Sequence, residues 1–158
     1  MLKPYCAISR QYVRDVLAGN IPACEWVRKA CQRQQDDEKR AKTDKGWPYR
    51  FDLLKAARIC KFIELLPHIK GEWAKHGQKI ELQPWQVFIL TTVFGWVSRE
   101  TDLRRFRTAY IEMPRKNGKS TFSSGVALYC LVADGEAGCE TYSAATTRDQ
   151  ARIVWADA

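Results

Sequence analysis

The sequence has few of the features that mark secreted, metal-binding or membrane-spanning proteins. No two of its six cysteines show the Cys-x-x-Cys spacing of zinc or redox sites. Neither His68 nor His76 lies at metal-ligand spacing from another histidine, a cysteine or a carboxylate. The most apolar stretch, residues 87–97, is far shorter than a membrane span and is interrupted by threonines and a glycine. The N-terminus has no apolar signal core. These absences predict a cytoplasmic protein, with no membrane segment, whose thiols remain reduced.

The chain has enough residues for one domain and carries an excess of positive charge. Its 158 residues can bury an adequate core, to which six Trp, six Tyr and six Phe contribute. Lysine and arginine number 26 and aspartate and glutamate 18, so the formal charge is 26 − 18 = +8. This balance suits an anionic partner such as a nucleotide or nucleic acid, without identifying one.

The first half of the chain predicts helices. One is expected over residues 4–17 with a stop at Gly19, and another follows Pro22. A third is expected over residues 53–66 with Asp52 as its N-cap. Residues 36–45 mix both charges without an apolar period, which predicts a solvated helix end or a loop. We therefore expect residues 1–80 to form a helical N-terminal region.

A further helix should begin at Pro84, a favoured first position. Its predicted core face is a broad stripe at helical spacing. The members of this stripe are Trp85, Phe88, Ile89, Thr92, Val93 and Trp96. Cys31, Cys60 and Cys130 also fall on apolar helix faces, which predicts buried, unreactive thiols.

The most informative segment is residues 108–121, in which a short apolar run leads into Gly118-Lys119-Ser120. Residues 110–113 predict a strand that ends at Pro114, and a helix with one buried face is expected from Lys119 onward. Residues 140–145 predict a second strand. Strand, loop, helix and strand in this order are the context of a phosphate-binding P-loop. The predicted fold is therefore α/β, the start of the parallel sheet of a P-loop NTPase core.

The loop departs from the general pattern G-x-x-x-x-G-K-[ST], because Met113 stands where the first glycine is usual. Arg115 and Lys116 follow Pro114 at once. The loop thus exchanges backbone freedom for positive charge, and Arg115 could fork onto two phosphate oxygens. The alternative is a basic turn between a strand and a helix, with no nucleotide chemistry.

The loop residues predict an ATP and Mg²⁺ site. Lys119 is expected to bridge the β- and γ-phosphates and to neutralise charge that develops during transfer, with Arg115 as a second catalytic candidate. Ser120 is the expected Mg²⁺ ligand through its hydroxyl. Asn117 and Gly118 should offer backbone N–H groups, and Gly118 should adopt a backbone conformation that is costly for other residues. Thr121 supports the first helical turn. Lys116 is a second-rank candidate for phosphate contact. The alternative is that it lies in a solvated basic loop without a ligand.

The run Arg115-Lys-Asn-Gly-Lys-Ser120 resembles the departed P-loop of the large terminase subunits of tailed bacteriophages. The resemblance extends in order over nearly the whole chain. The similar segments are residues 62–68, 70–73, 82–86, 94–96, 103–107 and 142–151. Members of this family are ATP-driven motors that package viral DNA and carry a separate nuclease domain.

The resemblance implies further roles and partners. It implies that Gln86, in its Pro-x-Gln setting, reads the adenine edge, whereas the residue alone would suggest an exposed helix glutamine. It implies double-stranded DNA, a portal protein and a small terminase subunit as partners, and a homo-oligomeric ring for the intact protein. It also implies a phage or prophage gene expressed in a bacterial cytoplasm.

The family's later ATPase elements have no counterpart in the 39 residues after Lys119. No apolar strand there ends in Asp-Glu, as a Mg²⁺-holding strand would, and the nuclease carboxylates are missing. We therefore expect residues 81–158 to be the N-terminal portion of the ATPase domain, able to bind nucleotide but catalytically incomplete. An exposed sheet edge should make this fragment sticky.

Other interpretations stay open at this point. A helicase or another P-loop enzyme would usually keep the first glycine, and a basic nucleic-acid-binding module would need no ATP. Arg104, Arg105 and Arg107 could contact DNA phosphates or a neighbouring subunit. Pairing of these arginines with Glu100 or Asp102 is slightly favoured over that role.

Overall fold

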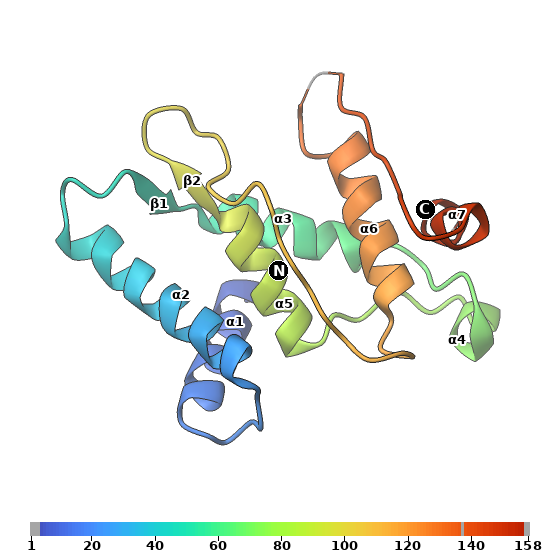
Figure 1. The fold of residues 1–158 in the computed structure, drawn as a ribbon, viewed down its shortest axis with the longest axis horizontal. Coiled ribbons are helices and arrows are strands. Elements are labelled where there is room, and N and C mark those ends of the chain that lie inside the picture. The colour runs from blue at the N-terminus through green and yellow to red at the C-terminus, as the bar shows by residue number, and fades with distance from the viewer. Residues whose placement is uncertain (1–3, 137, 157–158) are drawn as a thin grey trace. The chain divides into compact units, whose positions relative to one another are not determined.

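The computed structural model describes residues 4–136 and 138–156, which form two compact units interleaved along the chain (Figure 1). The described parts of the first unit are residues 4–61 and 82–109, and those of the second are 62–81, 110–136 and 138–156. The elements are α1 (Tyr5–Leu17), α2 (Glu25–Thr43), β1 (Tyr49–Phe51), α3 (Leu53–Ile63), α4 (Gly71–Lys75), α5 (Pro84–Gly95), β2 (Trp96–Ser98), α6 (Lys119–Val132) and α7 (Arg148–Ala156). The predicted boundary between residues 1–80 and 81–158 stays a prediction. The two compact units interleave along the chain, so they do not test a single boundary at residue 80.

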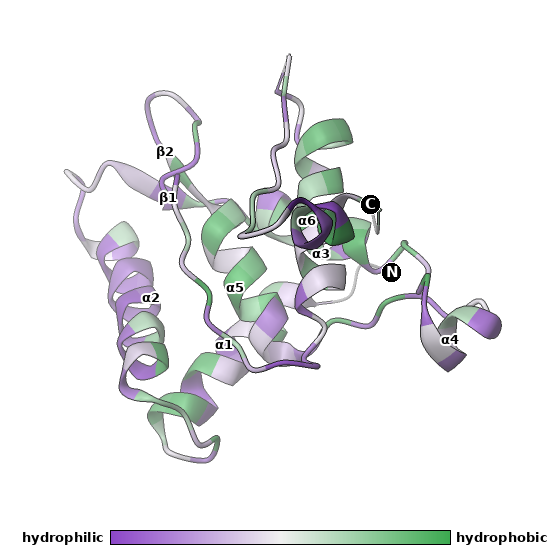
Figure 2. Ribbon diagram, turned by 45° about the vertical axis from the view of Figure 1, so that its right-hand side comes forward, coloured by the Kyte–Doolittle hydropathy of each residue, from purple (hydrophilic) through white to green (hydrophobic). Residues whose placement is uncertain are grey.

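The core of the first unit forms where α1 packs against α5 and α2. Val13 and Val16 of α1, Cys31 of α2 and Phe88 of α5 are buried together. The Tyr12 ring also lies 5.5 Å from the Phe88 ring. Figure 2 shows α5 largely hydrophobic, whereas α2 is hydrophilic along most of its length.

Helix α5 is buried on more sides than the sequence predicted. Pro84 opens it, as expected, but its buried residues include Val87, Leu90 and Thr91, which lie outside the predicted stripe. The hydroxyl of Thr91 reaches the Ser9 hydroxyl of α1 at 2.9 Å. A helix hydrophobic on all sides is enclosed by its neighbours, and a single stripe was therefore the wrong expectation.

The described strands that pair form a small antiparallel sheet, and not the start of a parallel one. β1 pairs with β2 in the register Tyr49↔Ser98, Arg50↔Val97 and Phe51↔Trp96. The Phe51 and Trp96 rings meet edge to face at 5.2 Å. Helices with this two-stranded sheet are compatible with an α/β fold. The parallel sheet was predicted for other residues, 110–113 and 140–145.

Gly95, where α5 meets β2, lies too close to its neighbours to tolerate a side chain. A Cβ there would lie 2.7 Å from a Phe51 ring carbon and 2.9 Å from the Ala56 Cβ. We expect Gly95→Ala to destabilise the protein by about 1–3 kcal/mol, because overpacking outweighs the gain in helix propensity. Urea denaturation measures the change.

The matched control for this prediction is Gly46→Ala, whose Cβ would make an ordinary 3.4 Å contact with Asp44. This control should change stability by less than about 0.5 kcal/mol. Equal stability of the two variants would contradict the tight packing at Gly95.

The structure confirms two of the predicted helix start and stop signals. Asp52 Oδ1 accepts hydrogen bonds from the N–H groups of Leu54 and Lys55, both at 3.0 Å, as an N-cap does. Burial alone would raise the pKa of Asp52, but these bonds and the Arg50 guanidinium hold it below its ordinary value. After α1, Gly19 adopts φ 82°, the left-handed conformation that ends helices.

Arg105 and Asp37 correct two expectations. The run 36–45 forms the end of helix α2, one of the two predicted alternatives, but its Asp37 is not solvated and is buried at 5% exposure. Arg105 Nη1 lies 2.6 Å from Asp37 Oδ2, so it pairs with neither Glu100 nor Asp102. The aromatic rings within 6 Å of the Arg105 guanidinium are those of Trp47, Tyr49, Trp96 and Phe106. Asp37 can be buried because it is paired, which charge patterning along the sequence could not reveal.

The second unit is organised around α6. Helix α6 packs against α7, and the Ser124 hydroxyl donates to the Val154 carbonyl at 2.7 Å. The Tyr129 ring meets the Phe62 ring edge to face at 5.4 Å. Gly125 brings α6 close to Ile63, since a Cβ would lie 3.1 Å from that side chain.

The two strands predicted beside the loop do not form. Residues 110–113 and 140–145 pair with no strand in the described chain, and Tyr110 and Tyr142 are 88% and 83% exposed. A strand is stable only when a neighbour satisfies its backbone groups. β-propensity alone therefore overestimated order in both segments.

The cysteines behave as expected, although Cys130 is only half-buried. All six lie in the described ranges and none is in a disulfide, and Cys31 and Cys60 are fully buried. Burial raises the pKa of Cys31 to about 11, so it stays neutral and unreactive. Separately, no helix in the described ranges is long and apolar enough to cross a bilayer.

Candidate functional site

The loop between residue 113 and α6 contains two residues in the left-handed backbone region. Gly118 is the N-cap of α6 with φ 68° and ψ 22°, which confirms the conformation predicted for it. Lys116 also has a φ of 68°, a conformation that is uncommon for a residue with a side chain. Left-handed residues in a tight turn direct successive N–H groups to one side, and such concavities bind anions.

Asn117 ties the loop together from within. Its Nδ2 lies 3.3 Å from both the Pro114 and the Arg115 carbonyl oxygens. The side chain thus has a structural role in addition to the backbone role predicted for it. This cross-link holds the turn closed although no glycine stands at its start.

The N-terminus of α6 carries unused hydrogen-bond donors. No side chain caps the helix, and the first intrahelical bond is from Phe122 N to Gly118 O at 2.9 Å. The N–H groups of residues 119–121 consequently lack partners in the described chain, as is usual for a first helical turn. The helix dipole adds about half a positive charge here, and no acidic residue in the first turn offsets it.

Three cations surround these donors. Arg115, Lys116 and Lys119 are exposed, and none has an ion-pair partner among the residues that the structure describes. The loop is therefore a local concentration of positive charge that no described carboxylate neutralises. Such a place attracts a polyanion.

Ser120 and Thr121 are half-buried in the first turn of α6. The Ser120 hydroxyl makes no hydrogen bond to the described residues and remains available as a ligand. A single hydroxyl oxygen suits Mg²⁺, which keeps several waters and takes its other ligands from phosphates. The donor set therefore fits a Mg²⁺–triphosphate complex.

Gln86 has a structural partner that the sequence reasoning missed. Its Oε1 accepts a hydrogen bond from Gln83 N at 2.8 Å and thereby caps the start of α5. The spacing Gln83-x-x-Gln86 at a helix start is the signal that would have indicated this. The Nε2 donor of Gln86 keeps no partner in the described chain. Gln86 lies in the first unit, whereas residues 115–121 are brought together by one turn of chain in the second.

Comparison with known proteins identifies part of the chain. Residues 84–158 match the family described as the terminase large subunit, ATPase domain. The match begins at the first residue of α5 and includes both Gln86 and the loop 114–121. No curated protein and no solved structure matches the chain.

Proposed function

We propose that this chain, whose residues 84–158 belong to a terminase large subunit ATPase domain, binds ATP and Mg²⁺ at the loop 114–121. In this proposal the loop is a Walker A motif and the second unit is part of a P-loop NTPase core. The intact protein of such a domain would drive double-stranded DNA into a phage or prophage capsid by ATP hydrolysis, in the bacterial cytoplasm. A portal protein, a small terminase subunit and further copies in a ring are its proposed partners.

One observation carries the nucleotide site. Three unpaired cations, an uncapped helix N-terminus and two left-handed residues occur within the seven residues 115–121. A polyphosphate chain needs these features, because each phosphate oxygen seeks an N–H donor or a cation. A surface loop without a ligand gains nothing from the strained Lys116 backbone.

Each residue of the loop would have a separate role in binding the nucleotide. Lys119 and Arg115 would neutralise the charge on the terminal phosphates, and the backbone N–H groups of residues 118–120 would hold the chain of phosphates in place. Ser120 would hold Mg²⁺ through its hydroxyl, and the bound ion would supply positive charge against the phosphates. Gln86 would read the adenine edge by accepting from the adenine amino group through its Oε1 and donating to an adenine ring nitrogen through its Nε2.

Titration of a fluorescent ATP analogue with Mg²⁺ into the purified chain tests the nucleotide site. We expect saturable binding that unlabelled ATP displaces and that a short DNA duplex does not. Displacement by the duplex alone would instead favour a basic nucleic-acid-binding module. The absence of saturable binding would remove the proposal.

Gln86→Ala tests the adenine role. We expect it to weaken ATP binding about tenfold and to reduce the preference for ATP over GTP, because hydrogen bonds to the base are lost. Gln83→Ala is the matched control, since it alters the same helix start without touching the proposed adenine contact. Both variants should lose about 1 kcal/mol of stability or less, and only Gln86→Ala should change the ATP preference. An unchanged ATP-to-GTP ratio would leave Gln86 with its capping role alone.

A further inference from the structure

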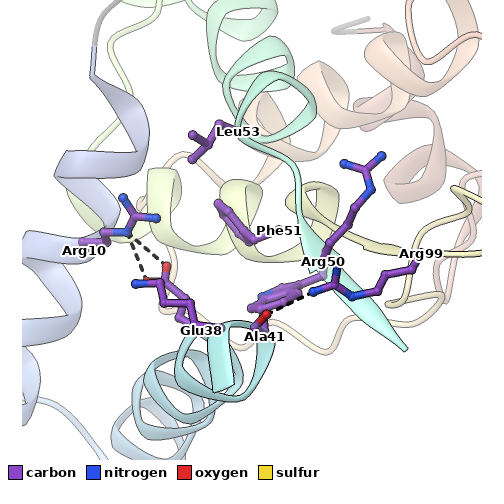
Figure 3. Close-up of a pocket in the computed structure, with 9 residues that line it drawn as sticks. Arg10, Glu38, Ala41, Arg50, Phe51, Leu53 and Arg99 are labelled. Carbon is purple, nitrogen blue, oxygen red and sulfur yellow. Dashed lines mark hydrogen bonds and ion pairs between the residues drawn. The ribbon is translucent and has the colours of Figure 1, made fainter. Parts of the chain in front are cut away.

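The first unit contains a hollow of about 260 Å³ between α1, α2, β1 and the residue that follows β2 (Figure 3). Its lining residues are Arg10, Glu38, Ala41, Lys42, Arg50, Phe51, Leu53, Trp96 and Arg99. Four of these side chains are cationic and one is a carboxylate. The hollow lies entirely within the first unit and so is separate from the loop 114–121.

The single carboxylate is already neutralised. Glu38 receives hydrogen bonds from Arg10 Nε at 3.1 and 3.2 Å and from Gln34 Nε2 at 3.2 Å. Figure 3 shows Arg10 reaching Glu38 from α1. Arg50 is neutralised as well, because its two Nη atoms lie 2.8 Å from Asp52 and 2.5 Å from Asp102. The surplus positive charge therefore belongs to the two remaining cations.

Those cations are Arg99 and Lys42. Arg99 donates through Nε to the Trp47 carbonyl at 3.1 Å and through Nη2 to the Ala41 carbonyl at 3.0 Å. Carbonyl oxygens hold the guanidinium in place without cancelling its charge, and its Nη1 has no partner among the described residues. The Lys42 ammonium makes no ion pair or hydrogen bond to any residue that the structure describes. The hollow thus combines a pre-positioned guanidinium with a mobile ammonium.

The volume and the lining residues of the hollow limit which ligands it can bind. Ligand pockets for whole small molecules are usually larger, about 300–1,000 Å³, so a complete nucleotide is too big. Its apolar lining includes Phe51, Leu53 and the fully buried Trp96. A compact anion with several oxygens fits the volume, and it can accept hydrogen bonds from both the planar Arg99 guanidinium and the Lys42 ammonium.

We propose that this hollow binds a phosphate group, held by Arg99 and Lys42 of its lining. The group is either free phosphate or a phosphodiester of a nucleic acid backbone, whose chemistry at the site is the same. The arginine supplies the oriented donors and the lysine the adjustable one. The site is independent of nucleotide binding in the second unit.

The experiment uses the whole chain carrying Lys119→Ala, which removes the proposed phosphate contact of the other unit. Inorganic phosphate, and in a second arm a short DNA duplex, is titrated while the Arg99 side-chain Nε–H signal and the backbone amides of residues 41–51 are followed by NMR. We expect saturable shifts at these positions with at least one titrant. Saturation by phosphate identifies the free anion, and saturation by the duplex alone identifies the nucleic acid backbone.

Lys42→Ala is the decisive variant, because the Lys42 side chain is exposed and has no partner among the described residues whose loss could unfold the protein. It should weaken binding about fivefold, as expected for one partly screened charge contact. Lys45→Ala is the matched control, an exposed lysine outside the hollow with the same change in net charge. Equal weakening by the two variants would assign the effect to net charge and overturn the proposal. The absence of shifts near Arg99 with both titrants would overturn it as well.

Discussion

Lys119→Ala is expected to reduce ATP binding about 100-fold or more while the protein stays folded. Lys119 is exposed at the first position of α6 and has no partner in the described chain, so its removal leaves no buried group unsatisfied. In the nucleotide complex its ammonium would make two charge-assisted hydrogen bonds to phosphate oxygens. At about 1.5 kcal/mol or more each, these account for about two orders of magnitude in affinity.

The matched control for this substitution is Lys79→Ala, which removes an exposed and unpaired lysine from the same unit. Fluorescent ATP-analogue titration gives the affinity, and circular dichroism melting confirms that both variants fold. We expect the control to bind within about twofold of the wild type, since Lys79 is not part of the loop and an exposed charge is screened by salt. Equal loss in both variants would mean that ATP responds only to net charge. In that case the loop would not be a nucleotide site.

Arg105→Ala is expected to cause the largest loss of stability, about 3–5 kcal/mol, because it leaves the Asp37 carboxylate buried and unpaired. The side chains of Arg105 and Asp37 are 17% and 7% exposed, and their charged atoms lie 2.6 Å apart. A loss of this size is a large share of the 5–15 kcal/mol typical of a whole folded domain. Urea denaturation followed by circular dichroism measures it.

The pair offers two controls of different kinds. Lys29→Ala removes an exposed partner of Glu25, whose side chain is 73% exposed, and should cost about 0.5 kcal/mol or less. The double variant Arg105→Met with Asp37→Leu should be more stable than Arg105→Met alone, because no charge is then left buried. A double variant as unstable as that single variant would show that the aromatic contacts of Arg105, and not the ion pair, dominate.

The arginine also has a consequence for function. Because Arg105 is held by Asp37 and packed among aromatic rings, it is a poor candidate for contact with DNA phosphates. Arg107 remains exposed in the same run and has no partner among the described residues. Of the two, Arg107 alone keeps the predicted possibility of binding an external anion.

Features that depend on a few neighbouring residues could be predicted from the sequence. The Asp52 cap, the stop at Gly19, the start of α5 at Pro84 and the left-handed Gly118 before α6 all formed as expected. Each depends on backbone groups within one or two turns of chain, so local residue chemistry determines it. The concentration of cations at residues 115–119 follows from the sequence in the same way.

Features that depend on distant partners were decided by the tertiary structure alone. Arg105 finds Asp37 across 68 residues, and Trp96 donates its indole N–H to Gln34 across 62. The strand over 110–113 did not form because a strand needs a neighbour to satisfy its backbone, whereas a helix satisfies most of its own. The hollow beside Arg99 likewise exists only where α1, α2 and β1 meet. The residues of the loop and its charge were thus set by the sequence itself, while burial, ion pairing and strand order required contacts that no local pattern encodes.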